Sequence, residues 1–232
     1  MRFSNTLSVG HPSPVGSFKH GEKGFSVIEL LIVFVVIMLI ATFSLFAMTS
    51  HKKLYKTDDQ ALKIIDVLRA ASLRAVTQRQ TIRVDINLTT SNVQMIDENL
   101  PTVSTDDVVV RTLALENVAE VKLSTAPLNV TALPPSPSNY PIAVFATSVH
   151  PLNTSNNVCT IRFSRNGSVL NAGTNALGAN AAITSSTIYI WPPQDADPTR
   201  ARTTGSVRAI TIFGPTGNIR FWKYNGTSFA LE

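Results

Sequence analysis

A long apolar run near the N-terminus constrains this chain more than any other feature. Residues 25–48 contain a single charged side chain, Glu29, and the 19 residues from Leu30 to Met48 contain none. As an α-helix, a stretch of that length is long enough to cross the ~30 Å hydrocarbon core of a bilayer. A cleavable secretory signal normally has a shorter apolar region followed by an Ala-x-Ala-like site. The sequence therefore predicts a membrane-spanning helix at 25–48.

Glu29 is the unusual residue of this run. A carboxylate inside a membrane helix is costly unless it is paired or lies close to the membrane interface. Two interpretations are open from the residues alone. Glu29 either lies at headgroup depth, where the N-terminus of a helix favours an anion, or has a dedicated partner.

The residues around Glu29 resemble a known processing signal. After the basic Lys23 the chain reads Gly24-Phe25-Ser26-Val27-Ile28-Glu29-Leu30-Leu31. This string is similar to the class III signal of type IV pilins and pseudopilins. The resemblance implies that prepilin peptidase cuts between Gly24 and Phe25, that Phe25 is then methylated, and that Glu29, at the fifth mature position, acts in assembly with other subunits.

The pattern changes after Met48 to that of an amphipathic helix. Apolar residues recur at three- and four-residue steps as far as residue 80, and no proline interrupts residues 25–79. We expect one long helix whose first half suits lipid or a helical bundle. Its second half needs a sheet to cover it. The residues expected on the covered face are Leu54, Ala61, Leu62, Ile65, Leu68, Ser72, Leu73 and Val76.

From residue 81 onward the sequence has the patterns of strands and turns. Residues 81–87 alternate polar and apolar side chains, as a half-buried strand does. Five prolines predict an irregular surface loop at 126–141. Strands are expected at 81–87, 92–96, 108–115, 118–123, 142–147, 183–191, 207–213 and 219–224, with a strand, turn and strand at 159–170.

A long helix followed by antiparallel strands belongs to the α+β class. We therefore predict a long N-terminal helix packed on an antiparallel β-sheet domain. The four predicted parts are a leader peptide at 1–24, a transmembrane part at 25–48, an amphipathic part at 49–80 and a β domain at 81–232.

Three further segments resemble a subgroup of the same family, the GspH/FimT minor pseudopilins. They are Leu68 to Ala75, Ile161 to Ser168 and Ile210 to Gly217. The resemblance implies a low-abundance subunit that starts or tips the filament of a type II secretion system or type IV pilus. Such a subunit crosses the bacterial inner membrane once, contacts its lipid, and places its C-terminal domain in the periplasm.

The titratable residues form no catalytic or metal-binding pattern. The four histidines show no His-x-x-x-His spacing, and the only cysteine, Cys159, cannot form an intrachain disulfide and is expected in the core. The pairs Asp58-Asp59 and Asp106-Asp107 are expected to be solvated charges rather than an acid–base dyad. We expect a protein that is not an enzyme and that uses no cofactor or metal.

The basic C-terminal third leaves a second function open. From residue 159 onward there are seven Lys/Arg and three Asp/Glu, a net charge of 7 − 3 = +4. Some FimT-like proteins bind DNA through a Gly-Arg-x-Arg motif, and here Gly217-Asn218-Ile219-Arg220 lacks the first arginine. Cations next to aromatic side chains are typical of single-strand binders. The candidate DNA-binding residues are Arg208, Arg220, Trp222 and Lys223.

Overall fold

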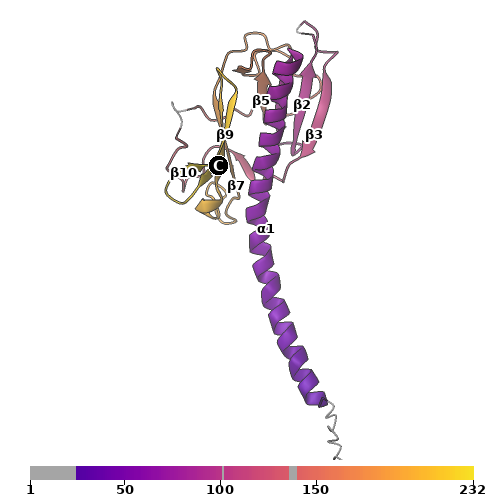
Figure 1. Cartoon of the computed structure of the whole chain (residues 1–232), viewed down its shortest axis with the longest axis vertical. Coiled ribbons are helices and arrows are strands. Elements are labelled where there is room, and N and C mark those ends of the chain that lie inside the picture. Colours follow the sequence, from indigo (N-terminus) through magenta and orange to yellow (C-terminus); the bar gives the residue numbers. More distant parts are fainter. Residues whose placement is uncertain (1–24, 101, 136–139) are drawn as a thin grey trace, which may run out of the picture. The chain divides into compact units, whose positions relative to one another are not determined.

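A computed structural model gives the fold of residues 25–100, 102–135 and 140–232, with side chains described except at 45–54 (Figure 1). Residues 1–24, which include the predicted cleavage residue Gly24, lie outside the described residues, as does the side chain of Leu54. The chain divides into two compact units, one ending at Phe46 and the other running from Ala47 to Glu232.

The described residues form one α-helix, ten strands and one short 3-10 helix. Their bounds are α1 Val27–Gln78, β1 Thr81–Asn87, β2 Asn92–Glu98, β3 Val108–Ala114, β4 Lys122–Ser124, β5 Val158–Phe163, β6 Val169–Leu170, β7 Ser186–Trp191, η1 Thr204–Ser206, β8 Arg208–Phe213, β9 Asn218–Tyr224 and β10 Phe229–Leu231.

The first unit is the apolar half of α1. Within the described residues, Val27–Ser44 is the one helical stretch whose length and composition suit a membrane crossing. Its side chains are all exposed, so none of the described residues covers them. An uncovered apolar surface of this kind needs lipid or other helices around it.

The second unit contains two antiparallel five-stranded sheets, which confirms the α+β prediction. The first sheet has the strand order β3-β2-β1-β5-β6 and the second the order β10-β9-β8-β7-β4. The predicted hairpin across Gly214 to Gly217 is present, since β8 pairs with β9 from Phe213↔Asn218 to Arg208↔Lys223. Gly217 takes the left-handed conformation that the turn requires, with φ of 65°.

One face of α1 packs on both sheets and forms the main core. Ile64, Val67, Leu68 and Ala71 are fully buried against strand residues of the two sheets. Full burial of one aliphatic side chain contributes about 1.5–3 kcal/mol. The sheet cover predicted for the second half of the helix is therefore confirmed.

The arc of the helix that is covered differs from the prediction at three positions. Leu62, Leu73 and Val76 were expected on the covered face, but they are 56%, 67% and 49% exposed. The buried arc is centred instead on Ile64, Leu68 and neighbouring residues. Apolar residues occur on two adjacent arcs of this helix, and steps of three and four residues do not distinguish them.

Two predicted strands differ from the structure. Residues 118–120 form a turn, and only Lys122–Ser124 pair as β4. Residues 142–147 form no strand. They make two isolated bridges instead, Ile142↔Thr187 to the second sheet and Ala146↔Val158 to the first. This segment crosses from one sheet to the other, so it cannot add a continuous strand to either.

A second, smaller core lies on the face of the second sheet away from α1. Tyr189, Trp191, Trp222, Tyr224 and Phe229 form an aromatic cluster there. Val130 of the proline-rich loop packs into it, and Ala126 and Ala132 lie against it. Residues 126–132 of this loop thus cover part of the second sheet.

Candidate assembly segment and buried polar network

The segment that carries the processing signal begins where α1 begins. Phe25 precedes the helix and is 81% exposed. Ser26 occupies the N-cap position, where its Oγ accepts a weak 3.4 Å hydrogen bond from the Ile28 N–H and its carbonyl accepts the first helical bond from Leu30. The helix therefore starts within two residues of the predicted mature N-terminus.

Glu29 lies in the first turn of α1 and is exposed. The positive end of the helix dipole favours a carboxylate at this place. No ion pair joins Glu29 to another described residue. Its carboxylate is therefore available to a group from outside this part of the chain.

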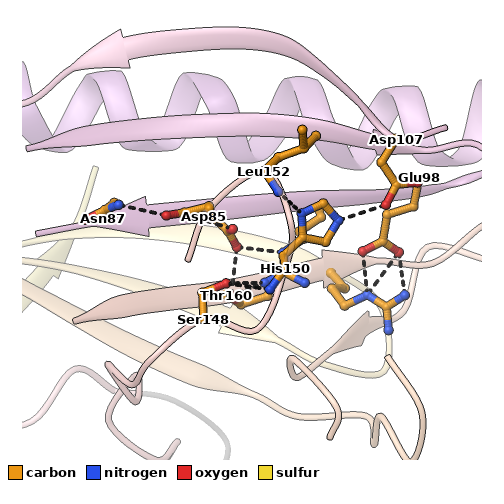
Figure 2. Close-up of polar contacts among 11 residues, drawn as sticks. Asp85, Asn87, Glu98, Asp107, Ser148, His150, Leu152 and Thr160 are labelled. Carbon is orange, nitrogen blue, oxygen red and sulfur yellow. Dashed lines mark hydrogen bonds and ion pairs between the residues drawn. The ribbon is translucent and has the colours of Figure 1, made fainter. Parts of the chain in front are cut away.

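The outer face of the first sheet carries a network of buried polar side chains (Figure 2). At its centre, Arg83 Nε donates to Asp85 Oδ1 at 2.9 Å, and Arg83 Nη2 donates to Ser148 Oγ at 3.0 Å. Thr160 on β5 donates to the same Asp85 oxygen at 2.7 Å. Arg83 and Asp85 are 1% and 0% exposed. The alternating pattern of β1 indicated a half-buried strand, but its polar face is covered too.

A segment that we call the strap, residues 146–157, provides this cover. Asn153 of the strap donates to Asp85 Oδ2 at 3.1 Å and accepts from Asn87 Nδ2 at 2.9 Å. The strap begins and ends at the bridge between Ala146 and Val158. Because ladder hydrogen bonds hold its ends and side chains hold its middle, the strap is fixed over β1.

His150 anchors the strap to the loop before β3. Its Nε2 lies 2.8 Å from Asp107 Oδ2, and its Nδ1 accepts a 3.3 Å hydrogen bond from the Leu152 N–H (Figure 2). In the tautomer in which Nδ1 accepts this bond, Nε2–H donates to Asp107. Both nitrogens have partners and the ring is fully buried, so His150 fixes the strap to Asp107.

This contact corrects the prediction for Asp106-Asp107. Asp107 is buried rather than solvated. The reason is the strap, which places a histidine donor over Asp107 from 43 residues away along the chain. A local pattern around Asp107 does not contain that partner.

At the other end of the network, Arg162 on β5 pairs with Glu98 on β2. Arg162 Nε donates to the two carboxylate oxygens at 3.0 and 3.1 Å, and Nη2 also binds Glu98. Nη2 reaches the Leu177 carbonyl at 3.2 Å as well. A Cβ on Gly178 would lie 1.3 Å from Arg162 Nη1, so only glycine lets the loop approach this closely. Arg162, held in place by Glu98, therefore fastens the 171–182 loop to the sheet through its bond to Leu177.

The network holds surface segments in place. Burial raises the pKa of the Cys159 thiol to about 12, with the nearby Asp85 charge adding to the shift, so the thiol stays protonated and is a poor nucleophile. Cys159 is buried, as predicted. Within the described residues, no group of three or more His, Cys, Asp or Glu side chains could hold a metal ion.

The four candidate DNA-binding residues do not form one exposed surface. Trp222 is buried in the aromatic cluster, where its Nε1–H donates to Thr211 at 2.9 Å. Arg208 is buried and pairs with Asp58, and Lys223 pairs with Glu232. Arg220 is exposed and makes no ion pair with a described residue. Stacking of bases on Trp222 would require the aromatic cluster to open.

Comparison with known proteins gives one match. Residues 19–45 match the family model described as the prokaryotic N-terminal methylation motif. The matched stretch contains Gly24, Phe25 and Glu29, and it shows a type IV pilin-like signal in this chain. Such a signal implies processing by prepilin peptidase, assembly with other pilins and a single-pass membrane anchor. No curated protein and no solved structure matches the chain.

Proposed function

We propose that this protein is a minor pilin or pseudopilin, a structural subunit of a type II secretion pseudopilus or a type IV pilus. The observation that carries the proposal is the methylation motif at residues 19–45, which contains the apolar helical stretch Val27–Ser44, a stretch that no described residue covers. A processing signal and a helix without internal partners are the two features that a filament subunit needs.

In this proposal cleavage before Phe25 frees an ammonium group, and Glu29 of a neighbouring subunit binds it. Leaving lipid for a helical bundle gains little hydrophobic free energy, so polar pairing must set the register between helices. Two opposite charges about 4 Å apart attract by about 4 kcal/mol at an effective dielectric constant near 20, part of which desolvation offsets. The exposed carboxylate in the first turn of α1 supports this role.

We further propose a place in the GspH/FimT subgroup, with a role at the start or tip of the filament. The support is the resemblance of the three segments at residues 68–75, 161–168 and 210–217. The β domain then lies in the periplasm before assembly, and the subunit has no enzymatic activity. DNA binding gains no support from the buried Trp222 and the paired Arg208.

Substitution of Glu29 tests the assembly step. Glu29→Ala should leave cleavage intact, because Gly24 and Phe25 remain, but it should lower incorporation into sheared filaments by at least about tenfold. Ser44→Ala, at an exposed uncharged position of the same helix, is the matched control. Immunoblots of sheared filaments and membranes measure both. Normal incorporation of Glu29→Ala would contradict the pairing.

A further inference from the structure

A groove of about 410 Å³ lies between α1 and the C-terminal strands, within the second unit. Four of its lining residues come from α1 and three from the end of the chain. They are Asp58, Leu62, Ile65, Arg69, Phe221, Lys223 and Glu232.

The groove has an apolar floor. Ile65 and Phe221 are buried members of the main core, and Leu62 beside them is 56% exposed. An apolar side chain that entered the groove would extend the core and remove Leu62 from water. Burial of apolar surface in this way is favourable.

The charged side chains around this apolar surface are paired except for one. Asp58 pairs with Arg208, and Lys223 pairs with Glu232. Arg69 makes no ion pair or hydrogen bond with any described residue. The other basic side chains described on α1, namely Lys56, Lys63 and Arg74, each have an acidic partner. The groove therefore presents one cationic side chain, Arg69, that has no ion-pair partner among the described residues and lies next to apolar surface.

Arg69 also belongs to an exposed stripe along α1. Leu62, Arg69, Leu73 and Val76 are seven, four and three residues apart, which places them on one side of the helix. All four are exposed.

We infer that this groove is a docking site for a neighbouring pilin-like subunit that offers an apolar side chain flanked by a carboxylate. The inference rests on the proposed function, because it takes the neighbour to be another filament subunit. The apolar floor selects the side chain and Arg69 selects the charge. A nucleic acid is disfavoured as the partner, because binding a phosphate backbone requires several cations and Arg69 is the one cation of the groove lining without an ion-pair partner among the described residues.

Photo-crosslinking in cells tests this inference on the full chain. A photoreactive amino acid at Leu73 lies in the stripe but outside the groove lining, and crosslinked products are identified by mass spectrometry. We expect a product with a protein that itself carries an N-terminal methylation motif. Arg69→Glu should lower the yield of that product at least about tenfold, and Arg69→Lys should lower it no more than about threefold.

Arg220→Glu is the matched control, since Arg220 is another exposed arginine without an ion-pair partner among the described residues. It should leave the yield unchanged. In the crosslinked neighbour, replacing the contacting Asp or Glu by Lys should restore the product of Arg69→Glu. Because Arg69 is exposed, unchanged protease resistance of Arg69→Glu should show that the variant folds.

Three results would overturn the inference. They are a yield that Arg69→Glu leaves unchanged, a product whose partner lacks the methylation motif, and the absence of any protein product. The proposed function fails separately, if wild-type protein is not cleaved before Phe25 or does not enter filaments. If the protein is cleaved and enters filaments but the crosslinking yield does not depend on Arg69, the groove is not the docking site. The proposed function would then still stand.

Discussion

The two sheets are covered on their outer faces in opposite ways. The strap covers the first sheet through hydrogen bonds to Arg83, Asp85 and Asn87. The proline-rich loop covers the second sheet through apolar contacts with an aromatic cluster that includes Trp191 and Trp222. Each loop thus fits only the surface whose chemistry it complements.

The difference predicts different responses to mutation. A buried charge that loses its partner stays buried and uncompensated, which costs about 3–5 kcal/mol. An apolar cluster tolerates a change of shape at similar volume for less than about 1.5 kcal/mol. The stability of the region under the strap should therefore change strongly when a single polar atom is replaced. The stability of the region under the proline-rich loop should depend mainly on the total apolar volume of the aromatic cluster.

The largest effect is expected for Asp85→Asn. The change keeps the shape of the side chain but leaves Arg83 as a buried cation without its anion. We expect the free energy of unfolding to fall by about 3–5 kcal/mol. Urea unfolding of detergent-solubilised protein, followed by the fluorescence of Trp191 and Trp222, measures it.

Asp59→Asn is the matched control for this change. Asp59 pairs with Lys63 on the exposed side of α1, and exposed pairs of this kind contribute about 0.3–0.5 kcal/mol. If both asparagine variants lost the same free energy of unfolding, the buried polar network of the first sheet would contribute no more to stability than an exposed ion pair.

A smaller effect is expected for Trp222→Phe in the aromatic cluster. The change removes the hydrogen bond from Nε1–H to Thr211 and part of the ring, but it keeps an aromatic side chain in place. We expect a loss of about 1–2 kcal/mol in the free energy of unfolding. Thermal unfolding followed by circular dichroism measures this loss. A loss of stability larger than that of Asp85→Asn would show that the aromatic cluster, and not the polar network, is the more sensitive of the two covers.

The smallest effect is a lack of reactivity at Cys159, which lies next to Thr160 on β5. Because burial raises the thiol pKa from 9.0 to about 12, a maleimide should not label Cys159 in folded protein at pH 8. Labelling should begin with unfolding of the first sheet, and therefore at lower urea in Asp85→Asn. Rapid labelling of the native protein would contradict the burial.

The same thiol gives a pH dependence with a definite sign. The unfolded thiol loses its proton near pH 9.0, whereas the folded thiol keeps it until about pH 12. The stabilisation is therefore complete below pH 9 and is lost as the pH rises from about 9 to about 12, by about 1.4 kcal/mol per pH unit. Cys159→Ser should lose this component.

Local periodicity was enough to predict the helix, most strands and the α+β class. Residues 81–87 and 219–224 alternate clearly, and both form strands. The three-residue strand β10 was missed, because so short a segment has almost no pattern. The methylation signal is equally local, and Ser26 caps the helix where the signal predicts that the mature chain begins.

The polar network could not be predicted in the same way. Arg83 and Asp85 alternate with apolar residues, and that pattern normally indicates a solvated strand face. Their cover comes from Ser148 and Asn153, more than 60 residues away along the chain. No local sequence pattern near Arg83 or within the strap predicts these contacts between β1 and the strap. Only the folded structure therefore reveals that both faces of β1 are buried.

The N-terminal residue of the mature protein tests the central claim most directly. Peptide mass spectrometry of membrane-extracted protein should find a chain that begins at Phe25 with one added methyl group. Gly24→Leu should leave residues 1–24 attached and keep the protein out of filaments. An unprocessed wild-type chain that begins at Met1, or a mature chain that begins beyond Met48, would contradict the assignment of a pilin-like subunit.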